Sequence, residues 1–405
     1  MANIQLKPEN FLDWDIKEGI LNQRDGYLNI GTSFVKMKVV AIKIEVATEF
    51  KESLLKILNS TNKKFSDHFI IQKMTEFFMN VYEEGYSETK YNLFLKKLQS
   101  FKTKQVNVYL KIYNLDLDVE KFDMPGFTLY NPVYFKQTYN SPFMYSSIND
   151  TSSVNMDNSI HTGIILKKLQ IIQEDPKQIM QVISEKITSF LNLLYICLGN
   201  KNAIQKLDFC FTHNNVEYHL FNDDMVEIGS SYSSDNSTFV KGSTQLKTNI
   251  FFENNKHLFS LFNNISNKLY EKIFRAAMWL GKSLKNENLG DSFLQAAIAL
   301  ECLLTRNEKG YVIQPSITYS LCETLALLVG DTKEKRIDLF KDLRKLYGYR
   351  SAIVHSGQTE VTFQDYYNLF DAIKQGIYVI LKLAEEQKWN NIEDIYTYVE
   401  SLKFS

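Results

Sequence analysis

The sequence lacks the patterns that would place it in a familiar class of metal, secreted or membrane proteins. Its four cysteines show no C-x-x-C spacing and lie in apolar runs, which is typical of reduced, buried thiols and argues against a zinc site. No run of about 18 apolar residues occurs, and the N-terminus has no apolar core of signal-peptide length. These absences predict a cytoplasmic protein with no membrane partner.

The sequence also has no excess of charge of either sign. The formal net charge is -1, and residues 263–405 carry 18 Lys and Arg against 18 Asp and Glu. This balance excludes a globally basic nucleic-acid binder, so a contact with RNA or DNA has to come from a local patch. There is no Gly-rich phosphate loop, nucleophile elbow or H-E-x-x-H motif, and we expect no cofactor and no metal.

With 405 residues, 44% of them hydrophobic, the chain is long enough for two or three domains. Alternating apolar residues at 40–46 and 106–112 predict strands, whereas Asp175-Pro176 opens a helical pattern with a capping signal. Two polar tracts, residues 139–160 and 222–249, are typical of long loops. We therefore predict a mixed α/β domain over residues 1–250, which could sense or bind a ligand or partner.

From about residue 254 the apolar spacing becomes purely helical. Successive stripes predict five or six helices, with start signals at Pro315, Thr332 and Thr362 and a stop signal at Gly330. Short connections between such helices indicate a bundle over residues 255–405. The fold class is then α+β, an N-terminal mixed region followed by an all-α bundle.

Arg350 and His355 are the residues that suggest chemistry. Arginine binds phosphate oxygens with a planar fork, and histidine is the side chain suited to proton transfer near neutral pH. Five of the six arginines fall in the last third of a chain that otherwise uses lysine. This distribution favours a specific use of the planar guanidinium at these positions. The pair predicts metal-free phosphodiester chemistry.

Two blocks carry a resemblance to a known family. Residues 299–304 read Ala-Leu-Glu-Cys-Leu-Leu, and residues 346–357 read Leu-Tyr-Gly-Tyr-Arg-Ser-Ala-Ile-Val-His-Ser-Gly. In a helical bundle, these blocks resemble the HEPN domain, and within it the Apea-like branch found in bacterial anti-phage proteins. The resemblance covers about 140 residues at the C-terminal end.

The resemblance implies a metal-independent endoribonuclease that acts as a homodimer through the HEPN bundle in anti-phage defence by abortive infection. RNA would be the substrate, and the N-terminal region would be the place for a phage-derived trigger. His355 would move a proton to or from the attacking or leaving oxygen, and Arg350 would stabilise charge on phosphorus. Ser351, Glu301, Arg275 and Tyr347 would support the site.

Other interpretations stay open at this point. His355 by itself is typical of a residue that caps a helix, and Ser351 could bind phosphate or cap. Glu301 is the only charge between Ala296 and Leu304, so it needs a donor, which could be Arg275 or another Arg in an ion pair between helices.

Two further alternatives concern the basic run and the function. The run from Lys333 to Lys345 is interleaved with acidic residues and is typical of a solvated helix face. A non-catalytic HEPN module that dimerises or binds nucleotide is the alternative function.

Overall fold

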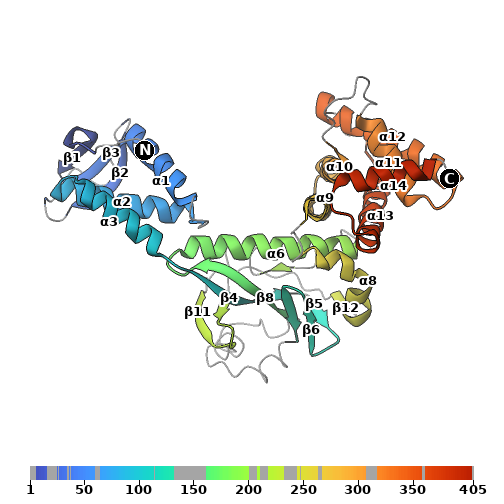
Figure 1. Cartoon of the computed structure of the whole chain (residues 1–405), viewed down its shortest axis with the longest axis horizontal. Coiled ribbons are helices and arrows are strands. Elements are labelled where there is room, and N and C mark those ends of the chain that lie inside the picture. The colour runs from blue at the N-terminus through green and yellow to red at the C-terminus, as the bar shows by residue number, and fades with distance from the viewer. Residues whose placement is uncertain are drawn as a thin grey trace. The chain divides into compact units, whose positions relative to one another are not determined.

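The computed structural model describes residues 6–15, 25, 27–33, 36, 38–59, 64–113, 115–131, 161–199, 208–209, 218–231, 244–246, 248–262, 267–306, 317–357 and 361–403 (Figure 1). Contacts between residues divide the chain into two compact units. The smaller unit is Met1–Val106 with Leu169–Ser184, and the larger is Asn107–Lys168 with Glu185–Ser405. The predicted boundary near residue 250 lies inside the larger unit and stays a prediction.

The smaller unit packs three helices on a three-stranded sheet of order β1-β3-β2. Its elements are the 3-10 helix Pro8–Asn10, β1 (Phe11–Asp15), β2 (Tyr27–Ser33), β3 (Lys38–Lys43), α1 (Ile44–Asn59), α2 (Asp67–Glu84) and α3 (Glu88–Ser100). Both neighbours of β3 run antiparallel to it. Rings from all three helices form the core; the Phe50 and Phe78 centroids lie 5.0 Å apart and those of Phe77 and Phe94 4.6 Å apart.

The strand predicted over residues 40–46 is too long. Strand β3 ends at Lys43 and helix α1 begins at Ile44, whose side chain is exposed. The buried residues that follow, Ala47, Phe50 and Leu54, are spaced three and four apart, so a helix buries them all on one face. This longer helical pattern prevails over the short alternation before it.

Asp175 connects distant segments of the smaller unit. Its carboxylate is fully buried and accepts hydrogen bonds from Ser66 N at 2.7 Å, Ser66 Oγ at 2.6 Å and Gln178 N at 2.9 Å. The bond from Gln178 N caps helix α6 (Pro176–Leu198), which starts as predicted at the Asp-Pro pair. The bonds from Ser66 fix the residue that caps α2.

Substituting Asp175→Asn should lower the free energy of unfolding by about 2 kcal/mol, because an amide brings a donor to a site where three donors already converge. Urea unfolding monitored by circular dichroism measures this loss. Asp67→Asn is the matched control, since Asp67 is exposed and, among the described residues, pairs only with Lys51 at 3.3 Å. Equal stability of the two variants would contradict the role assigned to Asp175.

The larger unit contains a seven-stranded sheet of order β11-β10-β4-β8-β7-β6, with β9 also paired to β4. The strands are β4 (Thr103–Tyr113), β6 (Lys121–Met124), β7 (Phe127–Tyr130), β8 (His161–Ile172), β9 (Asp208–Phe209), β10 (Tyr218–Phe221) and β11 (Glu227–Ser231). The strand predicted at 106–112 is β4. Helices α6 and α8 (Thr248–Ser260) pack against β7, because the Phe127 ring contacts Phe190 and Phe259 at centroid distances of 4.8 and 5.8 Å.

The second polar tract is not one long loop. It contains β11, the short strand β12 (Thr244–Leu246) and the start of α8. Strand β12 pairs in parallel with β5 (Leu115–Leu117), a partner far away in the sequence that local composition does not reveal. The first tract, residues 139–160, lies outside the described residues.

The described residues between 268 and 403 form the predicted helical bundle (Figure 1). Its helices are α9 (Lys268–Lys285), α10 (Leu289–Leu304), α11 (Ile317–Val329), α12 (Lys333–Ser356), α13 (Phe363–Gln387) and α14 (Ile392–Lys403). Thr332 and Thr362 cap their helices as predicted. The α+β fold class is confirmed, and no described helix has the length and apolarity that a membrane span requires.

Candidate functional site

Helix α12 carries most of the residues that the sequence singled out. Thr332 caps its first turn by accepting from Lys335 N, and Gly357 ends it in the left-handed conformation with φ 65°. A left-handed residue after the last turn favours glycine, which explains why the helix ends at Ser356, one residue beyond His355. Tyr347, Arg350, Ser351 and His355 therefore all lie on the C-terminal half of one continuous helix.

Glu301 of α10 brings Tyr347 and Arg350 of α12 together. Its Oε1 accepts the hydroxyl of Tyr347 and lies 3.2 Å from Arg350 Nη2. Tyr347 and Arg350 are three residues apart, so both project toward α10, and the guanidinium lies 6.0 Å from the centre of the Tyr347 ring. The structure thus gives Glu301 the ion pair between helices that its position required, with Arg350 as the partner.

The cluster is half-buried, which strengthens its interactions. The Arg350 and Glu301 side chains are 31% and 28% exposed, and Tyr347 is buried. Burial raises the pKa of Tyr347 and the hydrogen bond to Glu301 raises it further, while the charge of Arg350 opposes both. Because the pair uses one Nη of a guanidinium that has five N–H donors, Arg350 keeps donors for an anionic ligand.

His355 does not share this face. It lies exposed in the last turn of α12, and the helix is unbroken from Arg350 to Ser356. Positions five apart on an unbroken helix lie about 140° apart around the axis. Arg350 and His355 of one chain therefore point in different directions, with Ser351 exposed between them.

Arg275 forms its ion pair outside this cluster. It is exposed on α9 and pairs with Glu271 on the same helix at 3.5 Å. Its charge still reaches the residue after Glu301: burial raises the pKa of the Cys302 thiol, and Arg275 opposes that rise. Among the described residues, Arg350 and not Arg275 forms the ion pair with Glu301.

Tyr347→Phe should lower the free energy of unfolding by about 1–2 kcal/mol, because it removes a half-buried hydrogen bond to a carboxylate. Thermal unfolding measures the change. Tyr349→Phe, two residues along the same helix, is the control and should stay within about 0.5 kcal/mol of wild type, since its ring contacts Phe293 and its hydroxyl has no hydrogen bond within the described residues. Equal stability of the two variants would show that this hydrogen bond does not stabilise the fold.

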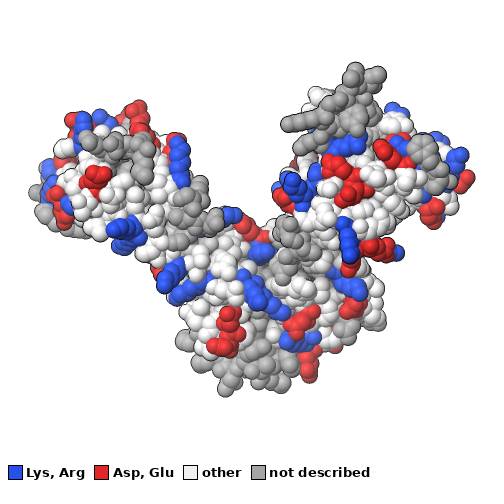
Figure 2. All heavy atoms as spheres, viewed as in Figure 1, with Lys and Arg blue, Asp and Glu red and all other residues white. Residues whose placement is uncertain are grey.

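Charged side chains of both signs are interspersed over the visible face of the bundle (Figure 2). No extended basic surface stands out there, in line with the equal numbers of acidic and basic residues in this region. Across the parts of the chain that the structure describes, no group of three or more His, Cys, Asp or Glu side chains is placed to hold a metal ion. A nucleic acid would have to bind through a few local cations.

Comparisons with protein-family models, with curated proteins and with solved structures give no match to this chain. The chemistry of the site therefore rests on its own residues and on the two sequence blocks.

Proposed function

We propose that the chain is a metal-independent endoribonuclease of the HEPN type, which works in the cytoplasm as an effector of anti-phage defence. The observation that carries the proposal is the arrangement on α12. Arg350 is held by Glu301 at 3.2 Å beside Tyr347, and five residues later an exposed His355 stands at the helix end. Both side chains can reach solvent, as groups that act on a large substrate must.

The chemistry needs one proton donor or acceptor and one fixed positive charge. The ribose 2'-hydroxyl attacks the neighbouring phosphorus, the 5'-oxygen leaves, and His355 transfers a proton to or from one of these oxygens. Arg350 stabilises the charge that develops on the phosphoryl oxygens. Glu301 and Tyr347 act by positioning the guanidinium. The products are a 2',3'-cyclic phosphate and a 5'-hydroxyl.

A second copy of the chain completes the site in this proposal. Because Arg350 and His355 are about 140° apart on α12, a two-fold axis beside the helix lets the Arg of one chain face the His of the other. The exposed side of α12 near His355 carries Gly348, Ser351 and Ala352, whose small side chains allow close approach. A glycine inside a helix costs about 1 kcal/mol relative to alanine, and no described residue of the same chain requires one at position 348.

A non-catalytic HEPN module that dimerises or binds nucleotide is the second candidate. The balanced charge of the bundle favours it, because RNA binding usually relies on clustered cations. A buried His355 would also favour it, but that side chain is exposed. The exposed imidazole makes the nuclease the better supported of the two.

The test is cleavage of RNA by the purified full-length chain. Total RNA or transfer RNA incubated with the protein in EDTA should be cut, and the fragments should carry a 2',3'-cyclic phosphate and resist 5'-phosphate-dependent exonuclease. Size-exclusion chromatography with light scattering should give a dimer. A dimer that leaves every RNA intact, with or without divalent cations, would favour the non-catalytic module.

A further inference from the structure

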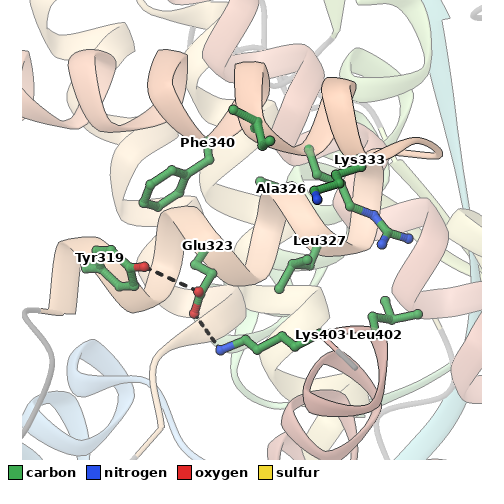
Figure 3. Close-up of a pocket in the computed structure, with 10 residues that line it drawn as sticks. Tyr319, Glu323, Ala326, Leu327, Lys333, Phe340, Leu402 and Lys403 are labelled. Atoms are coloured by element: carbon green, nitrogen blue, oxygen red, sulfur yellow. Dashed lines mark hydrogen bonds and ion pairs between the residues drawn. The ribbon is translucent and has the colours of Figure 1, made fainter. Parts of the chain in front are cut away.

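A pocket of about 730 Å³ lies between α11 and the N-terminal half of α12, away from the candidate nuclease site. The last two residues of α14, Leu402 and Lys403, border it as well (Figure 3). Tyr319 and Phe340 contact each other in it with ring centroids 5.1 Å apart, and Tyr319 and Ile337 are 39% and 44% exposed. Large apolar side chains left in water around a pocket are typical of a surface that binds another molecule.

One side of α12 faces this pocket. The lining residues of this helix are spaced three or four apart: Lys333, Arg336, Ile337 and Phe340. They fall within about 100° of one another around the helix axis. Arg344 extends the same stripe by one turn, because its guanidinium lies 5.8 Å from the centre of the Phe340 ring. The pocket side of α12 therefore has apolar side chains in the middle and cations at both ends.

The helix separates these cations from the acidic residues that are interleaved with them in the sequence. Measured from Lys333, the acidic residues of α12 before Arg344 lie about 100–180° around the axis: Glu334, Asp338 and Asp342. Among the described residues that line the pocket, Glu323 is the only carboxylate, and it is neutralised by Lys403 at 2.8 Å. The surface presented to a ligand is therefore positive as well as apolar.

The three cations of the stripe are available to a ligand. Within the described parts of the chain, Lys333, Arg336 and Arg344 form no ion pair with a carboxylate. The Nε of Arg336 donates to the carbonyl of Gly330 at 2.9 Å, which holds the guanidinium in place and leaves its terminal nitrogens for an acidic partner.

These cations are too far apart for one small anion to meet them all. Lys333 and Arg344 are eleven residues apart on the continuous helix α12, so about 16 Å separates their Cα atoms. Figure 3 shows the rings of Tyr319 and Phe340 at the end of the pocket away from Lys333. An occupant that reaches both ends needs about three turns of helix, with carboxylates at its ends and apolar residues between them.

We propose that this pocket docks an acidic amphipathic helix of another protein. The apolar stripe of that helix covers Tyr319, Ile337 and Phe340, and its carboxylates pair with the cations at the two ends of the pocket. A helix forms its own backbone hydrogen bonds, which suits a pocket whose walls are helices and offer no strand edge. Docking requires no RNA cleavage, so its test stands apart from that of the proposed nuclease.

The experiment selects ligands for the full-length chain from a displayed library of random peptides of about 16 residues, long enough for four helical turns. The enriched peptides should have apolar residues at helical spacing and more Asp and Glu than Lys and Arg. A fluorescein-labelled copy of the most enriched peptide is then titrated with the chain, and its anisotropy gives the dissociation constant. Changing its Asp and Glu to Asn and Gln should weaken binding about tenfold, and so should raising NaCl from about 0.05 to about 0.5 M, because salt screens exposed charge pairs.

Two pairs of variants assign the binding to the pocket. Ile337→Glu should weaken the peptide about tenfold or more, because it puts a negative charge among the apolar contacts. Its control is Ile250→Glu, at an isoleucine of α8 that is 64% exposed. Lys333→Gln should weaken the peptide about two- to fivefold, the usual effect of one exposed ion pair. Its control is Lys335→Gln, where the lysine pairs with Asp331 at 2.9 Å and does not line the pocket.

All four substituted side chains are exposed, so the fold should be preserved, and circular dichroism verifies that it is. Three results would overturn the proposal. Enrichment of no peptide, or of peptides with no excess of acidic residues, would remove the charge complementarity on which it rests. Equal binding to the Ile337→Glu and Ile250→Glu proteins would place the helix elsewhere. A lower oligomeric state of the Ile337→Glu protein than of wild type, measured by light scattering, would mean that a second copy of the chain occupies the pocket.

Discussion

His355→Ala and Arg350→Ala should each lower the rate of RNA cleavage by roughly 100- to 10,000-fold, the usual contribution of a proton-transfer group or of a charge that stabilises the transition state. Initial rates on a labelled RNA in EDTA measure the loss. The fold should survive both changes, because His355 is exposed and Arg350 is half-buried at the rim of the bundle. Circular dichroism and the thermal midpoint verify that it does.

Matched controls separate catalysis from a general loss of charge. His257→Ala removes a partly buried histidine of α8 that pairs with Glu385 at 2.7 Å, and Arg344→Ala removes an exposed arginine of α12. Both should cut RNA at close to the wild-type rate. If the four variants lose activity equally, or if none loses it, the assignment of Arg350 and His355 is wrong.

Mixing the two inactive proteins tests the two-fold site. In a dimer with one Arg350→Ala chain and one His355→Ala chain, the intact Arg350 and the intact His355 belong to different chains. Because the two positions are about 140° apart on one helix, the site is expected between chains, and mixing should restore part of the activity. No recovery after exchange of subunits would place both groups of a working site on the same chain.

Gly281→Ala should lower the free energy of unfolding by about 3 kcal/mol, the largest loss we expect from adding one methyl group. Helix α9 crosses α6 at this residue, and a Cβ there would lie 2.3 Å from the carbonyl oxygen of Asn192 and 2.6 Å from its Cα. Backbone atoms of a helix cannot turn aside as a flexible side chain can, so the two helices must separate. Chemical denaturation of the full chain measures the change.

Gly348→Ala is the control with the opposite sign. In the part of the chain that the structure describes, no atom lies within 4 Å of a Cβ at this helical position, so alanine should raise stability by about 0.5–1 kcal/mol through helix propensity. If Gly281→Ala unfolds at the wild-type denaturant concentration, the close crossing of α9 and α6 is wrong. Loss of cleavage in a stabilised Gly348→Ala protein would indicate that the exposed face of α12 is approached closely by RNA or by a second chain.

Helices of the bundle could be predicted because their signals are local. Leu343, Leu346 and Tyr347 repeat at helical spacing on α12 and are all buried, and Thr332 and Gly357 stand at its ends as cap and stop. Strand ends in the first half were less predictable. Ile44 continues an alternating pattern yet starts a helix, because the residues that decide its conformation lie further along the chain.

The sequence alone determined where the candidate chemistry lies, since Arg350 and His355 lie five residues apart in one block, on a helix whose limits are locally encoded. It did not determine their partners. Only the tertiary structure selects Arg350 over Arg275 as the partner of Glu301, and only helix packing places Lys333, which belongs to a run typical of a solvated face, in one pocket with Tyr319. Periodicity is a property of neighbouring residues, whereas a site depends on which helices meet, and that is set by packing across the whole bundle.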